Sequence, residues 1–172
     1  MKDSKMSDAV IIERAHSLAN HAMWTVALQY RRIRATEPED GKFLFRWWAD
    51  LQFLILALYR LRTTVKIARN IPSISNSIDA ALAKFDKALP DLKKLRDIGE
   101  HMEEYAVDNP KRHVPSVDRK QLQVGSWDGT VYEWLGVKLN VNEAKSAAEE
   151  LFKTLQNHYS LFRSKNRTTP KP

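Results

Sequence analysis

Apolar positions follow helical spacing along most of the chain. Over residues 7–36 the apolar side chains recur every three or four positions, which predicts one long amphipathic helix. This apolar stripe consists of Val10, Ile11, Ala15, Leu18, Ala22, Val26, Tyr30 and Ile33. The turn-forming sequence at 36–41, TEPEDG, ends the segment, and a second long helix is predicted over 43–70. The second helix is apolar on almost every side between Leu51 and Leu58, so we expect it to be the most buried element.

The region after the second helix contains a third helical pattern over residues 73–109, with Pro90 in its middle. Proline lacks a backbone donor and clashes with the preceding turn, so we expect either a kink or two separate helices. In the second case Pro90 lies near the first turn of a helix that reaches about Val107. The last helix is predicted over 142–163. Asn140 or Asn142 is expected to cap it.

A change of pattern marks the segment that precedes the last helix. Residues 121–124 alternate polar and apolar, Asp128 and Gly129 form a tight-turn dipeptide, and β-forming residues fill 130–134 and 137–141. We therefore predict a small antiparallel β insertion of two or three strands at about 120–141. The predicted fold class is mainly all-α, an antiparallel four- to five-helix bundle with this insertion before the last helix.

Length and composition limit the classes of protein that fit. The chain has 172 residues and no cysteine, so it can bury a core as one domain, predicted over residues 1–163, without disulfides or a zinc finger. The polar, basic residues 164–172 are predicted to form a disordered tail. The most apolar stretch, 43–59, contains Arg46 and Asp50 and is shorter than the ~20 residues of a membrane-spanning helix. We expect a cytoplasmic protein with no membrane partner.

The distribution of charge and of aromatic residues sharpens this picture. The net charge is +7, which permits a nucleic-acid partner, but the basic residues gather at 31–34 and 60–69, at opposite ends of the predicted helix pair. A solvated helix surface is the default interpretation. The largest aromatic group consists of Phe43, Phe45, Trp47, Trp48 and Phe53. We expect most of these to pack in the core, and one of them to belong to a dimer interface.

One motif on the predicted third helix carries most of the functional information. In the sequence LKKLRDIGEHMEEY, Arg96 is followed directly by the polar Asp97 and, after four intervening residues, by His101. An arginine, a polar neighbour and a histidine at this spacing, on a late helix of an all-α bundle, resemble the signature of the HEPN domain family. Pro90, which opens the helix, and the run LRDxxEH also look similar.

The resemblance implies a specific chemistry. Active HEPN domains are ribonucleases that need no metal or other cofactor, and they form homodimers in which two Arg/His pairs face one composite cleft. Carried over to this chain, His101 would act on the proton of the attacking 2′-hydroxyl or of the leaving oxygen. Arg96 would hold the scissile phosphate, and Asp97 would orient one of the two. RNA is then the substrate, and the catalytic residues are Arg96, His101 and Asp97.

Two alternatives remain open from the residues themselves. A non-catalytic dimerisation or protein-binding module is favoured by the carboxylates around His101, at Asp97, Glu100, Glu103 and Glu104, because they repel an RNA backbone. In this interpretation Arg96 pairs with Glu100, Asp97 pairs with Lys93, and His101 is an interface or surface residue. The Arg-to-His spacing also occurs a second time, at Arg14 and His21.

A metal-binding bundle enzyme is the third hypothesis. Glu13 and His16 have the Glu-x-x-His spacing of di-iron bundles, but no second copy of the motif exists. His16, His21, His101 and His158 lie on three predicted helices and could meet in a bundle interior. Each has solvent-type neighbours in sequence, so a surface position is the more common outcome, and our leading interpretation contains no metal.

Overall fold

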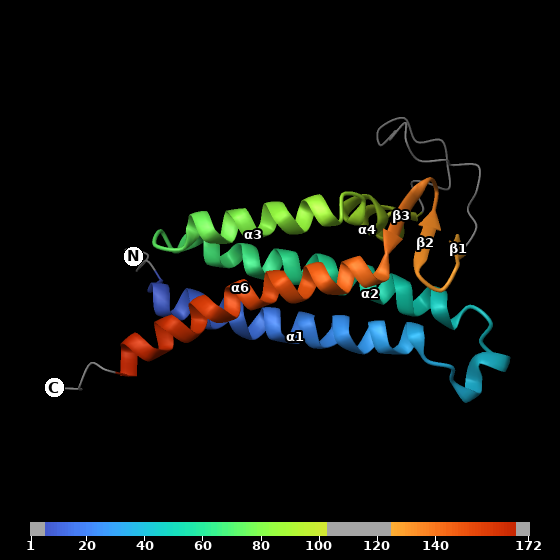
Figure 1. The fold of residues 1–172 in the computed structure, drawn as a ribbon, viewed down its shortest axis with the longest axis horizontal. Coiled ribbons are helices and arrows are strands. Elements are labelled where there is room, and N and C mark those ends of the chain that lie inside the picture. Colours follow the sequence, from blue (N-terminus) through green and yellow to red (C-terminus); the bar gives the residue numbers. More distant parts are fainter. Residues whose placement is uncertain (1–5, 103–124, 168–172) are drawn as a thin grey trace.

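The computed structural model describes residues 6–102 and 125–167. Within these residues the long helices lie lengthwise side by side, and a small sheet stands at one end (Figure 1). The long helices are α1 (Asp8–Arg34), α2 (Arg46–Lys66), α3 (Ser75–Ala88) and α6 (Val141–Arg167). Helix α1 packs against α2 and α6, and α6 also packs against α3. The predicted class, a mainly helical bundle, is confirmed.

The connections between these helices follow the predicted breakpoints. A short 3-10 helix, η1 (Pro38–Gly41), occupies the turn between α1 and α2, and a second one, η2 (Ile67–Asn70), extends the end of α2. Pro90 lies between α3 and α4 (Leu92–Glu100), so the structure has two helices there rather than one kinked helix. The remainder of the predicted helix, beyond Met102, lies outside the described residues.

The predicted β insertion is present as an antiparallel sheet in the order β1-β2-β3. Its strands are β1 (Ser126–Trp127), β2 (Val131–Trp134) and β3 (Val137–Asn140). The carboxylate of Asp128 accepts hydrogen bonds of 2.7 Å from the backbone N–H groups of Thr130 and Val131, and Gly129 has a φ of 94°. These contacts form the tight turn that was predicted. The strand expected at 121–124 lies outside the described residues.

Helix α6 begins directly after the sheet. The side-chain oxygen of Asn140 accepts hydrogen bonds from the backbone N–H groups of Asn142, at 3.0 Å, and Glu143, at 3.3 Å. Asn140 is therefore the cap, one of the two residues expected. The helix continues to Arg167 and not only to the predicted end at Arg163, so residues 164–167 are helical and not part of a loose tail.

The hydrophobic core runs along the middle of the bundle. Helix α2 contributes the most continuous part of it, with Leu51, Leu54, Leu58, Leu61 and Val65 fully buried. This confirms that α2 is deeply buried. No helix among the described residues is long and apolar enough to span a membrane.

The expectation that most of the aromatic group packs in the core is wrong for three of its members. Phe43, Phe45 and Phe53 are 63%, 55% and 56% exposed. Phe43 and Phe45 lie in the connection before α2, which begins at Arg46. No other helix among the described residues covers them there. Phe53 lies on the outward side of α2, because Leu51 and Leu54 face the core. Part of the aromatic group is therefore exposed on the surface of the bundle.

Candidate functional site

The Arg-Asp-His motif lies on α4 and at its end. The apolar side of this helix, formed by Leu92, Leu95 and Ile98, is buried in the core. Packing of that side fixes the position of the intervening polar residues, and the side chain of Arg96 is left 24% exposed. Arg96 is therefore half-buried, on a helix whose apolar side packs into the core of the bundle.

Arg96 is held by two carboxylates and one aromatic ring. Its Nη1 atom donates a hydrogen bond to Asp97 Oδ1 at 2.5 Å, and its Nε atom is 2.7 Å from Glu100 Oε2. The guanidinium carbon lies 4.4 Å from the centroid of the Tyr59 ring on α2, at cation–π distance. Burial works against the charged form of Arg96, but the Asp97 hydrogen bond and the charges of Glu100 and Asp97 outweigh it and raise the pKa of Arg96.

This arrangement agrees with only part of the predicted pairing. The ion pair between Arg96 and Glu100 was expected in the non-catalytic interpretation, and it is present. Asp97, however, binds Arg96 and not Lys93. The structure therefore brings Arg96 and Asp97 together, so Asp97 is in position to orient the guanidinium group.

His101 is separated from this cluster. It is the residue at which α4 ends, with a φ of −124°, and its backbone N–H donates to the carbonyl of Asp97 at 3.0 Å. Its half-buried side chain forms no hydrogen bond or ion pair with Arg96 in the described part of the chain. Positions five apart on a helix point in different directions, which explains why the two side chains do not converge within one chain.

Arg96 and Glu100 line a surface groove of about 680 Å³ between α1, α2 and α4, which we call the α1/α2 groove. Its lining includes Leu18, His21 and Ala22 of α1, and Phe53, Ala57, Tyr59 and Arg60 of α2. Ala22 and Ala57 are buried, whereas Leu18 is 49% exposed and Phe53 is 56% exposed. Large apolar side chains therefore border a groove with small residues at its floor.

Charges of both signs also line the α1/α2 groove. Arg60 is exposed and forms no ion pair within residues 6–102 and 125–167, while Glu100 is paired with Arg96. Sequence reasoning did not identify this groove. Leu18 was assigned to the core stripe, and a surface that combines residues 18–25, 53–64 and 96–100 has no signature in the local sequence.

The histidines lie in different surroundings. The His16 ring stacks on Tyr159 of α6 with centroids 3.9 Å apart, and burial lowers the pKa of His16 although Glu13 opposes this. His158 shares a 2.9 Å hydrogen bond with Ser77 of α3. His21 lines the α1/α2 groove. Among the described residues there is no group of three or more potential metal ligands.

Comparison with known proteins adds no further constraint. The chain matches no protein-family model, no curated protein and no solved structure.

Proposed function

We propose that the protein is a helical binding module that works as a homodimer through the α1/α2 groove. The observation that carries the proposal is the pair of large apolar side chains, Leu18 and Phe53, which lie uncovered at this groove. Exposed apolar side chains that border one groove are typical of association surfaces, whereas single scattered ones are common on any protein.

A second copy of the chain suits the groove because its charges are self-complementary. In a two-fold dimer the same patch meets itself, so Arg60 of one protomer can face the partner's Glu100 and the reverse. Arg60 is exposed and forms no ion pair with a described residue, so it is free to make this contact. Leu18 and Phe53 would then be covered by their counterparts, which removes apolar surface from water.

Light scattering after size exclusion, over a range of protein concentrations, tests the dimer. We expect a dimer for the wild type and a monomer for the Leu18→Ser, Phe53→Ser double variant. Leu161→Ser is the matched control, since Leu161 is 58% exposed on α6 and lies outside the groove. A monomeric wild type, or equal weakening by the control, would contradict the proposal.

A metal-independent, HEPN-like ribonuclease is the second candidate function. It is supported by the position of Arg96, whose oriented guanidinium group lines the same groove. A dimer formed there would bring two copies of Arg96 into one cleft, and His101 is the residue directly after α4 in each copy. Arg96 would hold the phosphate, while His101 would take the proton of the 2′-hydroxyl or protonate the leaving oxygen. Asp97, at 2.5 Å, would keep the guanidinium oriented.

Cleavage of single-stranded RNA in the presence of a chelator tests this second candidate. We expect the wild type to cleave, and Arg96→Ala and His101→Ala each to lose activity by about 100-fold or more, as expected for loss of a general acid–base group or a charge-stabilising donor. Arg14→Ala is the matched control, because Arg14 belongs to the other Arg-to-His spacing in this chain. No cleavage by the wild type would refute the nuclease and leave the dimer proposal standing.

A further inference from the structure

The connection between α1 and α2 projects from the end of the bundle at which the sheet stands (Figure 1). It displays three consecutive apolar side chains, Phe43, Leu44 and Phe45, which are 63%, 72% and 55% exposed. We call residues 42–45 the apolar tip. Three adjacent large apolar residues at this level of exposure form a continuous patch, unlike the isolated exposed residues of an ordinary surface.

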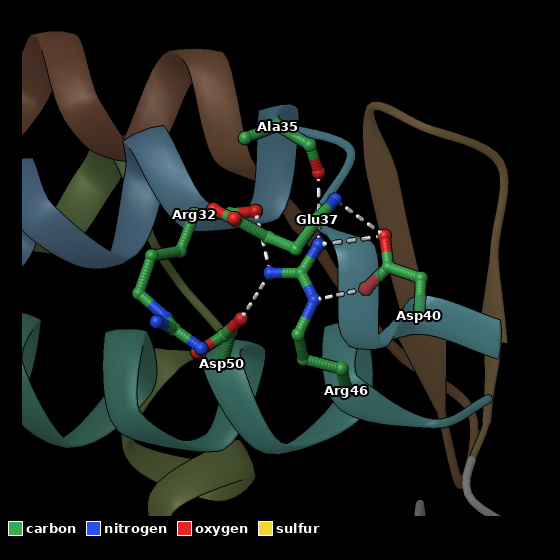
Figure 2. A network of polar contacts seen from close by, with 6 residues as sticks. All are labelled: Arg32, Ala35, Glu37, Asp40, Arg46 and Asp50. Atoms are coloured by element: carbon green, nitrogen blue, oxygen red, sulfur yellow. Dashed lines mark hydrogen bonds and ion pairs between the residues drawn. The ribbon is translucent and has the colours of Figure 1, made fainter. Parts of the chain in front are cut away.

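The exposure of the apolar tip is a fixed feature of the turn. Arg46 donates hydrogen bonds to the carbonyls of Arg32, at 2.9 Å, and Ala35, at 2.8 Å, and also binds Asp40 and Asp50 (Figure 2). These bonds tie the end of α1, the 3-10 turn and the start of α2 together. Both ends of the segment that carries the apolar side chains are therefore held in place by Arg46.

Lys42 places a positive charge beside the apolar side chains of the tip. Phe43, Leu44 and Phe45 border a shallow hollow of about 670 Å³, whose other lining residues are Arg32, Lys42, Arg46 and Ala49. Lys42 is exposed and has no ion pair in the described part of the chain. Residues 31–46 contain five basic and three acidic residues, which leaves a small positive excess. Arg32 and Arg46 are paired with Asp50 and Asp40, so the charge offered to a partner at the hollow is that of Lys42.

We propose that the apolar tip is a contact site for an anionic phospholipid surface. A protruding apolar turn inserts into the soft interface of a bilayer, where it needs no preformed concave partner, and the ammonium group of Lys42 meets a lipid phosphate. The expectation of no membrane partner was based on the lack of a spanning segment, and a peripheral contact does not need one. The apolar tip shares no residue with the α1/α2 groove, so the two proposals are independent.

Sedimentation with vesicles tests the contact. The full chain is mixed with vesicles of phosphatidylcholine alone, and with vesicles of phosphatidylcholine and phosphatidylglycerol in a two-to-one ratio. We expect binding to the second kind, weakened by added salt because the charges are screened, and little binding to the first. Lys42→Gln should lower the affinity about fivefold, the effect of one cation near an anionic surface.

A matched pair of substitutions separates the apolar tip from exposed apolar surface in general. Leu44→Ser should lower the affinity roughly tenfold, as expected for one buried leucine side chain, and Leu161→Ser on α6 should leave it unchanged. Helical circular dichroism confirms that both variants are folded. Failure of the wild type to bind either vesicle would overturn the proposal and point to a protein partner for the apolar tip. Equal losses for the two leucine variants would also overturn it.

Discussion

Two arginines of this protein each meet two carboxylates, but their contacts differ in kind. Arg46 joins three segments of the chain: its bonds reach the last turn of α1, Asp40 in the 3-10 turn, and Asp50 in α2. Its side chain is only 10% exposed, and that of Asp50 is 5% exposed. The contacts of Arg46 therefore satisfy carboxylates and backbone carbonyls that meet only because the chain is folded.

Arg96 has carboxylate partners from its own helix. Asp97 is the next residue and Glu100 is one turn further on, so these ion pairs involve no residue of another element. Among the described residues, the ring of Tyr59 on α2 is what links Arg96 to another element, through a cation–π contact. The comparison teaches that the number of carboxylate partners does not show how much an arginine contributes to the stability of the fold. What matters is whether its bonds cross between segments and how deeply they are buried.

Replacing Arg46 should have the largest effect on stability. Arg46→Ala leaves the buried Asp50 with Arg32 alone and frees two backbone carbonyls, so we expect a loss of about 3 kcal/mol in the free energy of unfolding. Urea unfolding followed by circular dichroism measures it. Arg46→Lys keeps the positive charge but lacks the planar guanidinium group with its several donors, so it should recover only part of the lost stability. Full recovery of stability by lysine would show that the charge at this position matters, and not the geometry of the guanidinium group.

An intermediate case lies between α2 and α3. Arg62 forms a two-point contact with Asp86, with Nε to Oδ1 at 2.6 Å and Nη2 to Oδ2 at 2.7 Å. The pair crosses between helices but is partly exposed, so solvent weakens it and Arg62→Ala should cost about 1 kcal/mol. The same urea experiment measures this loss, and Lys84→Ala, which breaks a more exposed pair with Glu150, is the control. If Arg62→Ala cost as much as Arg46→Ala, burial would not be the deciding factor.

The Arg46 network should also make stability depend on pH. Hydrogen bonds from Arg46 and from the backbone N–H of Glu37 lower the pKa of Asp40. A carboxyl whose pKa is lower in the folded state stabilises the fold above its unfolded pKa, about 3.9, and this contribution is lost as the pH falls through the folded pKa.

The measurement is the urea midpoint of the wild type and of Asp40→Asn as the pH is lowered below about 4, where the unfolded carboxyl begins to take up protons. We expect the variant to be less stable at neutral pH and to change less on acidification. Asp128, whose pKa is lowered by the backbone N–H groups of Val131 and Thr130, contributes to acid sensitivity in the same direction, so Asp128→Asn should also reduce the change on acidification. An unchanged slope for Asp40→Asn would contradict this account of the network.

Much of the fold could be predicted because it is encoded locally. The apolar periodicity of α1 and α2, the break at Pro90 and the turn at Gly129 depend on residues close together in sequence, and each was found near its predicted place. The surfaces could not be predicted in this way. Whether Leu18 faces the core or the groove depends on the angle at which α1 packs against α2, and periodicity alone does not give that angle.

The candidate site shows the same limit. The pairing of Arg96 with Glu100 follows from helical spacing and was predicted, whereas the stacking on Tyr59 joins residues 37 positions apart and was not. The exposure of Phe43 and Phe45 depends on how Arg46 holds the turn between α1 and α2, which is a long-range property of the fold.

Replacing Arg96 should destabilise the fold less than replacing Arg46, which tests the comparison between the two arginines directly. Arg96→Ala removes partly exposed ion pairs within one helix and one cation–π contact, so we expect a loss of only about 0.5–1 kcal/mol. Tyr59→Leu is the companion variant, since it removes the aromatic face and keeps the ion pairs. A loss this small would support the proposal that Arg96 acts on a contact outside its own chain. Unfolding data that placed Arg96→Ala beside Arg46→Ala would argue against that proposal and make Arg96 a structural residue.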